Sequence, residues 1–249
     1  RSTLFPYTTL FRSLCLFDAG NDEASAVIRK RAEEKQAPCY PVRPQQLKIK
    51  KITRKNIDFS FASRYDDVIP IEIPFVAEYQ VMNMALAYQA LMLLAPRFSL
   101  AREKILLALR TVRWAGRMQQ VCPEVYFDGA HNTAGIEEFL KTVRQIGGKK
   151  PLLLFSMVKE KDYAAVVRML SRTDWGGIVV THIPDARGLS VAALQEEFEK
   201  NGKETVGIND CRAAYDGVMQ KKEPGQTVFC TGSLYLIGEL EKIAGGLKK

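Results

Sequence analysis

The second half of the chain alternates short apolar segments with helical segments, and this alternation limits the possible folds more than any other feature. The predicted strands are residues 125–128, 151–155, 177–181, 205–208 and 227–231. The predicted helices start near Asn132, Asp162, Ser190, Asp210 and Ser233. Strict alternation of strand and helix requires crossover connections, so the sequence predicts an α/β fold with a doubly wound, mostly parallel sheet.

The first half of the chain has a less regular pattern. Strand-like segments at 14–17, 47–52, 57–61 and 68–75 surround a helix that starts at Asp22 and a loop marked by Pro41 and Pro44. Prolines 70 and 74 indicate an edge strand. Two helices follow, one at 79–94 ending at Pro96 and an amphipathic one at 100–112. We expect one domain at 14–113 and a second at 114–249, with a hinge at 114–117.

Residues 1–13 do not have the pattern of a folded segment. The stretch from Thr3 to Ser13 repeats Thr-Leu-Phe and resembles the translation of a sequencing adaptor. We therefore interpret 1–13 as a non-native scar and leave it out of fold reasoning. We expect the natural protein to continue upstream of Leu14.

The composition is typical of a globular protein with a buried core. Hydrophobic residues make up 47% and charged residues 26%, and the net charge is +8, which favours anionic partners. The one dense basic run, residues 48–55, alternates like a half-exposed strand, and we favour that interpretation over a nucleic-acid patch. Five widely spaced cysteines and only two histidines predict no metal site and no disulfide framework, and favour a reducing cytoplasm. No apolar run reaches membrane-spanning length.

Polar residues gather where three predicted strands end, at 128–132, 156–162 and 230–233. Ligands of parallel α/β sheets bind at such carboxyl ends, where helix N-termini attract anions. Each segment also has an ordinary structural interpretation. Gly232-Ser233 and Lys161-Asp162 suit helix caps as well as ligand contacts, and Arg117 suits either a phosphate clamp or a surface position.

Four motifs, taken in order, resemble one family. They are Gly116-Arg117-Met118-Gln119, Asp128-Gly129-Ala130-His131-Asn132, Met157 with Lys161-Asp162, and Thr231-Gly232-Ser233-Leu234-Tyr235. Together with Tyr79-Gln80-Val81-Met82-Asn83, they resemble the folylpolyglutamate synthase / dihydrofolate synthase family of the Mur ligase superfamily. The resemblance runs from about Leu14 to Leu240.

The resemblance implies both an architecture and a set of site residues. The second domain would be the glutamate-ligase domain, and 14–113 would be the C-terminal part of the ATP-binding central domain. Asn83, Arg117 and Asp128 match positions that contact ATP, with Arg117 on the phosphates. His131 and Ser233 match positions that bind the incoming glutamate, and these two are the candidate catalytic residues.

The chain departs from the family pattern at several positions. Ala77 and Tyr79 replace the usual glycine and histidine of the helix motif, and Thr133 stands where proline is common. The sequence has no Gly-x-x-x-x-Gly-Lys-Ser/Thr phosphate loop. The family's Mg²⁺ ligands lie in the same missing region, so we expect the chain to be an N-terminally truncated ligase that is inactive alone.

The expected function is ATP- and Mg²⁺-dependent addition of L-glutamate to a folate through an acyl phosphate, by a cytoplasmic monomer that binds neither nucleic acid nor membrane. Conversion of dihydropteroate to dihydrofolate is a second reaction that the resemblance leaves open. One alternative is a peptidoglycan Mur ligase. Another, of a different class, is a non-enzymatic basic module that binds anions or nucleic acid.

Overall fold

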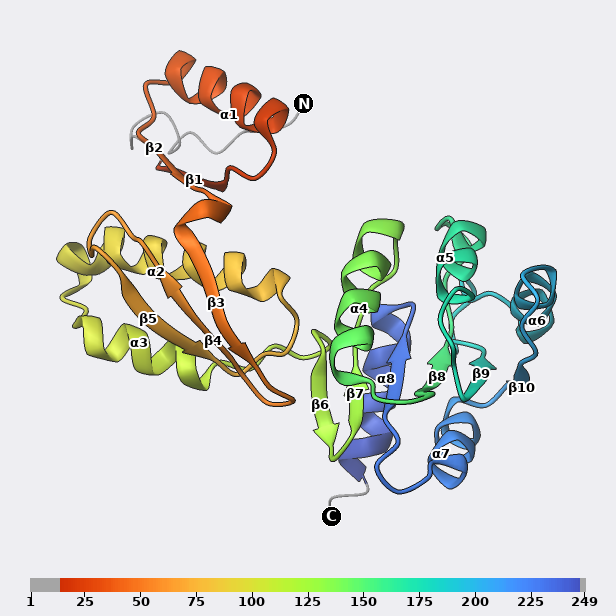
Figure 1. Cartoon of the computed structure of the whole chain (residues 1–249). Helices are drawn as coiled ribbons and strands as arrows, with labels where there is room; N and C mark the ends of the chain where they lie inside the picture. The colour runs from red at the N-terminus through yellow and green to blue at the C-terminus, as the bar shows by residue number, and fades with distance from the viewer. Residues whose placement is uncertain (1–13, 247–249) are drawn as a thin grey trace. The chain divides into compact units, whose positions relative to one another are not determined.

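The computed structural model describes residues 14–246 and divides the chain into two compact units (Figure 1). The first unit comprises the chain up to Pro74 together with Glu78–Val112. The second comprises Phe75–Ala77 together with the chain from Arg113 onward. The scar predicted at 1–13 lies outside the described residues.

The first unit begins with two parallel strands that are connected by one helix. Strand β1 (Cys15–Asp18) pairs with β2 (Cys39–Val42), and α1 (Asp22–Glu34) connects them, capped by the Asn21 side chain. The loop predicted around Pro41 is wrong, because Pro41 lies inside β2 opposite Phe17. Among the described residues β2 has a neighbour on one side only, and an edge strand tolerates the missing N–H of proline. Pro44 opens a short 3₁₀ helix, η2 (Pro44–Gln46).

Three antiparallel strands form the second sheet of this unit, in the order β3-β4-β5. They are β3 (Leu47–Ile52), β4 (Ile57–Phe61) and β5 (Ile69–Ile73), and β5 is an edge strand of this sheet, as predicted; it contains Pro70, whereas Pro74 follows it. Strand β4 is largely buried, whereas the lysines of β3 are exposed. Residues 48–52 of the basic run lie in this strand as predicted, but the predicted half-exposed alternation is wrong, because Ile49 between the lysines is exposed as well.

Two helices complete the first unit. Helix α2 (Tyr79–Phe98) does not end at Pro96 as predicted but continues for another two residues. Proline removes one hydrogen-bond donor, and near the end of a helix this costs only one backbone bond. Ser99 then ends α2 in the left-handed conformation, and α3 (Arg102–Thr111) follows with Ile105 and Leu109 buried.

A buried tyrosine connects α2 to the loop before β5. Tyr88 is fully buried, and its hydroxyl donates to Asp66 Oδ2 at 2.7 Å, while Arg102 pairs with Asp66 Oδ1 at 2.7 Å. Burial and the hydrogen bond to Asp66 raise the pKa of Tyr88 to about 12.

We expect this unit to lose stability in alkali as a consequence. The unfolded chain releases the tyrosine proton near pH 10, before the folded chain does, so the contribution of Tyr88 is complete below pH 10 and falls as the pH rises towards 12. The Tyr88→Phe variant should lose about 1 kcal/mol of unfolding free energy at pH 7. Its circular dichroism melting curve should also depend less on pH between 10 and 12. An unchanged alkaline slope would contradict this assignment.

The second unit contains a six-stranded sheet in the order β10-β9-β8-β11-β7-β6. Five strands are parallel, namely β7 (Val125–Phe127), β8 (Leu152–Phe155), β9 (Gly177–Thr181), β10 (Val206–Ile208) and β11 (Val228–Thr231). The sixth, β6 (Gln119–Cys122), is antiparallel to β7, and the sequence analysis missed it. A sharp turn at Glu124, with φ of 65°, joins the two strands.

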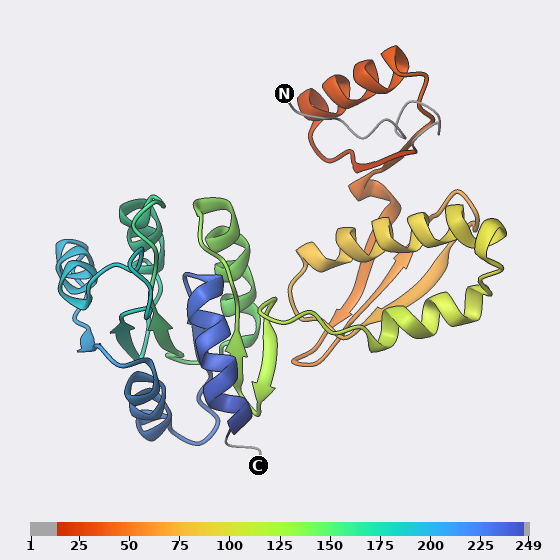
Figure 2. The ribbon, with the colours of Figure 1, turned by 180° about the vertical axis from the view of Figure 1, so that it is seen from behind.

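Helices cover both faces of this sheet, as the alternating pattern predicted. They are α4 (Thr133–Ile146), α5 (Tyr163–Leu170), α6 (Val191–Lys200), α7 (Cys211–Lys221) and α8 (Leu234–Gly246). Asn132, Asp162, Ser190 and Asp210 each cap the following helix through a side-chain oxygen. Figure 2 shows α4, α5 and α6 in a row on one face, while α7 and α8 pack together on the other. None of the helices between residues 14 and 246 has both the length and the apolar character that crossing a membrane requires.

Strand β11 lies at the centre of this unit although it is the last strand in the sequence. Its Phe229 is fully buried and stacks on Tyr126 of β7 with ring centroids 5.6 Å apart. Phe139 and Trp175 contact the same ring edge-on at 5.7 and 6.5 Å. This packing fixes β11 between β7 and β8, so their carboxyl ends open onto one edge of the sheet.

Candidate functional site

Asp128 follows β7 at that edge, and its carboxylate connects two loops. The side chain is only 3% exposed. Oδ2 accepts the N–H of Met118 at 2.9 Å, and Oδ1 accepts the N–H of Ala130 at 2.8 Å. A buried carboxylate needs such partners, because an uncompensated charge is costly away from water. Asp128 therefore holds the residue after Arg117 and the residue before His131 in fixed positions.

His131 lies at the end of the same loop, just before α4. Its Nδ1 is 2.8 Å from the carbonyl oxygen of Gly129, and a carbonyl can only accept, so this ring nitrogen carries the proton. In the neutral ring Nε2 then has a free lone pair. The side chain is half-buried. Asn132 begins the helix by accepting the N–H of Gly135 at 2.8 Å, so His131 lies directly at a capped helix start.

The turn after β11 lies against this loop. Gly232 donates its N–H to Ala130 O at 3.1 Å, and its φ of 112° is a conformation that residues with a side chain rarely adopt. Ser233 is 2% exposed, and its Oγ accepts the N–H of Tyr235 at 3.1 Å in the first turn of α8. Of the two interpretations of Ser233, capping is the one that these contacts show. The hydroxyl proton is still able to donate to a ligand.

Arg117 is attached to the same cluster through its neighbours. Gly116 accepts the N–H of Gly129 at 2.8 Å, and Met118 donates to Asp128. Arg117 is half-buried as a residue, and its guanidinium carbon lies 5.9 Å from the ring centre of Trp114. The structure thus places four predicted residues, Arg117, Asp128, His131 and Ser233, on loops that hydrogen-bond to one another.

The other predicted residues lie elsewhere or have structural contacts. Asn83 belongs to the first unit, where it is exposed on α2 and donates to Gln80 Oε1 at 2.9 Å. Asp162 caps α5 by accepting the N–H of Ala165 at 3.0 Å, and Lys161 is exposed. Met157 is fully buried. For the Lys161-Asp162 pair, the cap is again the role that the structure shows.

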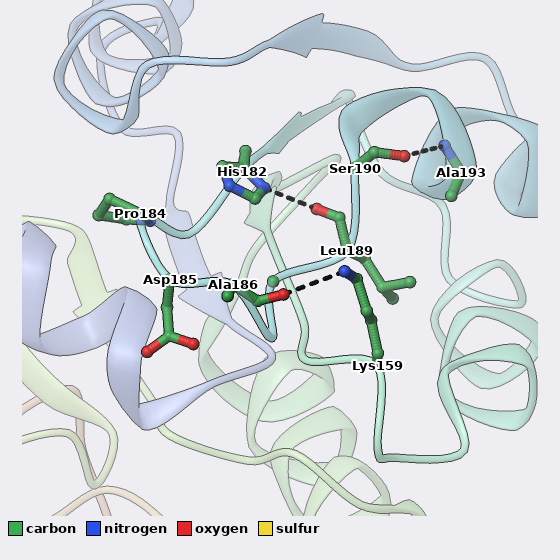
Figure 3. A pocket seen from close by; sticks show the side chains of 9 residues that line it. Lys159, His182, Pro184, Asp185, Ala186, Leu189, Ser190 and Ala193 are labelled. Carbon is green, nitrogen blue, oxygen red and sulfur yellow. Dashed lines mark hydrogen bonds between the residues drawn. The ribbon is translucent and has the colours of Figure 1, made fainter.

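A cavity of about 630 Å³ lies beyond the ends of β8 and β9 (Figure 3), and its lining includes none of Arg117, Asp128, His131 and Ser233. Its polar lining includes Lys159, whose Nζ donates to Ala186 O at 3.0 Å, and His182, whose Nδ1 is 3.0 Å from Leu189 O. Ser190 caps α6 from the same wall. The sequence analysis included Lys159 in a converging segment and predicted Ser190 as a helix start, but it assigned neither His182 nor Ser190 to a site. The signal available for these two was a polar residue directly after β9 and a capping serine before α6.

An arginine connects the wall of this cavity to the first turn of α8. Arg187 makes two hydrogen bonds of 2.9 Å to the Asp185 carboxylate through Nε and Nη2, and this contact holds the pKa of Asp185 far below its usual range. The guanidinium also lies 4.3 Å from the ring centre of Tyr235. The loop after β9 is thereby attached to the helix that Ser233 caps.

Residues 116–234, which contain this whole arrangement, match the model described as "Mur ligase, glutamate ligase domain". The second unit is a Mur ligase glutamate ligase domain. The predicted fold class is therefore confirmed, and so is the family resemblance drawn from the motifs.

Curated relatives match most of this chain at low identity. It is 25% identical to the folylpolyglutamate synthase of Lacticaseibacillus casei over 76% of this chain and 44% of that protein. It is 26% identical to the dihydrofolate synthase/folylpolyglutamate synthase of Bacillus subtilis strain 168, over 88% of this chain and 52% of that protein. The chain thus spans about half the length of the curated relatives it matches.

Solved structures agree on the fold. Folylpolyglutamate synthase of Mycobacterium tuberculosis, crystallised with ADP and AMPPCP, superposes with a TM-score of 0.78 at 19% identity. The superposition covers 92% of this chain and 55% of that one, so the likeness in fold extends over residues of both units.

Proposed function

We propose that this chain is part of an ATP-dependent ligase that adds L-glutamate to a folate. The observation that carries the proposal is the connected cluster at the carboxyl ends of β7 and β11, where the N–H of Gly232 binds Ala130 O. It joins the histidine loop to the serine turn. The names of the relatives support the substrate class, since they are folylpolyglutamate and dihydrofolate synthases.

The proposed chemistry proceeds in two steps. A folate carboxylate attacks the γ-phosphate of ATP, so that ADP leaves and an acyl phosphate forms. The amine of L-glutamate then attacks the acyl carbon, and phosphate leaves as the amide forms. Both steps build up negative charge on oxygens, which positioned cations and hydrogen-bond donors stabilise.

Each residue of the cluster has a role that its contacts permit. Arg117 is the cation for the ATP phosphates, because its neighbours Gly116 and Met118 are anchored by hydrogen bonds to the histidine loop. His131 Nε2 is an acceptor for the ammonium group or amine of glutamate. Ser233 donates its hydroxyl proton towards a carboxylate or phosphate oxygen. Asp128 acts by positioning both loops, and Asn83 is proposed as an ATP contact from the first unit.

The phosphate and magnesium sites are only partly represented in this chain. The sequence has no phosphate loop. Between residues 14 and 246, no group of three or more His, Cys, Asp or Glu side chains is suited to hold a metal ion. We therefore propose that the ligands of Mg²⁺ and most contacts to the triphosphate belong to residues outside this chain, and that the chain alone does not turn over.

Radiolabelled L-glutamate provides the direct test. The intact gene product should attach the label to tetrahydrofolate only when ATP is present, whereas the chain described above should not. Incorporation by this chain alone would contradict the proposal of inactivity. Dihydropteroate as the acceptor tests for a second activity. Acceptance of a UDP-muramyl peptide in place of folate would instead favour a peptidoglycan ligase, and nucleic-acid binding with steep salt dependence and no ATP affinity would favour a binding module.

The Arg117→Ala variant of the intact ligase should lower kcat by roughly 100-fold, because one preorganised cation on the phosphates is lost. Steady-state turnover with labelled glutamate measures the effect. Arg144→Ala is the matched control, since Arg144 is exposed in the last turn of α4. Equal rates for the two variants would rule out a role for Arg117 at the phosphates.

A further inference from the structure

Two cysteines lie opposite each other at the start of the β1–β2 sheet. The parallel register pairs Cys15 with Cys39, and each is the first residue of its strand. Neighbouring strands lie about 4.8 Å apart, and disulfide-bonded cysteines have Cα atoms about 4.4–6.8 Å apart. Side chains paired in register project from the same face of a sheet. The two sulfur atoms are therefore on one side of the sheet, at a separation that a bond can close.

Both thiols are free and half-buried, so a small reagent can reach them. Burial and the neighbouring Cys39 thiol raise the pKa of Cys15. Only a small fraction is thiolate at neutral pH, and the reaction speeds up as the pH rises. The remaining cysteines do not face another cysteine in register: Cys122 lies opposite Val125, Cys230 lies opposite Phe127 and Leu154, and Cys211 is a buried residue in α7.

We propose that Cys15 and Cys39 are a thiol modification site that forms a reversible cross-strand disulfide. The oxidant is a small disulfide of the glutathione class. The thiolate of one cysteine attacks it, forms a mixed disulfide and releases one thiol. The second cysteine gives up its proton, attacks the protein-bound sulfur of the mixed disulfide and releases the second thiol. The protein loses two protons and two electrons, and the small disulfide gains them.

This bond would close a loop around α1. It would link the chain before Asp22 to the chain after Glu34, and so restrict the unfolded state of the first unit. The separation of paired strands lies within the range for disulfides, so the bond can form without a large movement of the backbone. In a reducing compartment such a bond would be transient and redox-sensing.

The test uses the whole chain and oxidised glutathione. After incubation at pH 8 and alkylation of the free thiols under denaturing conditions, the intact mass should show three alkyl groups on the five cysteines together with the loss of two hydrogen atoms. Peptide mapping should find Cys15 linked to Cys39, and dithiothreitol should reverse the link. The oxidised chain should melt several degrees above the reduced chain. Stable glutathione adducts on both cysteines without an internal link would overturn the proposal.

Serine variants distinguish proximity from general reactivity. Cys15→Ser and Cys39→Ser should each stop at a mixed disulfide on the remaining cysteine of the pair. Cys122→Ser should form the internal link as the unchanged chain does, because Cys122 is half-buried but lies outside the pair. Linkage of Cys122 to Cys15 or Cys39 in comparable yield would also overturn the proposal. If a serine variant fails to fold, the intact mass and peptide map of the unchanged chain still support or overturn it.

Discussion

The Gly232→Ala variant is expected to lose about 4 kcal/mol of unfolding free energy in the second unit, from backbone strain and overpacking together. A Cβ at Gly232 would lie 2.2 Å from the carbonyl oxygen of Ser156 and 2.5 Å from the Phe155 ring. The carbonyl cannot move without disturbing β8. The φ of 112° adds strain for any residue with a side chain. Both tryptophans, Trp114 and Trp175, belong to the second unit, so urea unfolding followed by their fluorescence measures the loss.

Gly225→Ala is the matched control for this prediction. Gly225 also has a positive φ, 78°, but a Cβ there meets nothing within 4 Å. It should cost only about 1 kcal/mol, which is the strain of the left-handed conformation. If both variants lose the same amount, the close approach of Ser156 does not determine the cost at Gly232.

The second large effect is expected at Asp128. The Asp128 carboxylate accepts two backbone N–H groups, those of Met118 and Ala130. The asparagine side chain has only one oxygen that can accept, so its NH₂ group would face one of these two N–H groups. Leaving one buried donor unpaired and removing the charge should cost about 3 kcal/mol. The same fluorescence-detected unfolding measures it. In the proposed intact ligase the variant should also lose turnover, because the loops of Arg117 and His131 are no longer joined through one carboxylate.

Asp210→Asn makes the same chemical change at an exposed helix cap. Asp210 accepts the N–H of Ala213 at 2.8 Å, and asparagine caps helices about as well as aspartate, so the cost should stay below about 0.5 kcal/mol. A stability of Asp128→Asn equal to that of this control would show that Asp128 does not bridge the loops in solution.

Most of the second unit could be predicted from the sequence, because its local signals agree with its final structure. Buried parallel strands read as continuous apolar runs, and Asn132, Asp162, Ser190 and Asp210 are strong caps by residue type. Strand β6 was not predicted, because it is short, partly exposed and paired with the strand that follows it directly in the sequence. No periodicity is visible in four residues of mixed burial.

Proline caused the errors in the first unit. It was interpreted as a breaker at Pro41 and Pro96, yet Pro41 lies in a strand and Pro96 in a helix. The missing N–H of proline destabilises a structure only where a neighbouring carbonyl group would otherwise accept its hydrogen bond. That is decided by strand edges and helix ends, which local sequence does not reveal.

The sequence predicted that polar loops would gather at the strand ends, but it did not show what each side chain contacts. Strand ends predicted that the loops of His131 and Ser233 would lie together, and they do. The burial of Asp128 and its two backbone partners depend on how distant segments pack, and no local pattern records this. The contact between Arg187 and Tyr235 joins residues far apart in sequence for the same reason.

The position of β11 also bears on how the protein is made. A ribosome adds roughly 5–20 residues per second, and β11 emerges after every other strand of its sheet. Until β11 emerges, β7 and β8 lack the strand that pairs with both of them. The backbone groups that later bond to β11, including those near Tyr126 and Leu153, then have no partner strand. A chain that terminates before Val228 would lack β11, so the facing edges of β7 and β8 would stay unpaired. Unpaired strand edges can pair with other unfinished chains and are accessible to quality-control proteases.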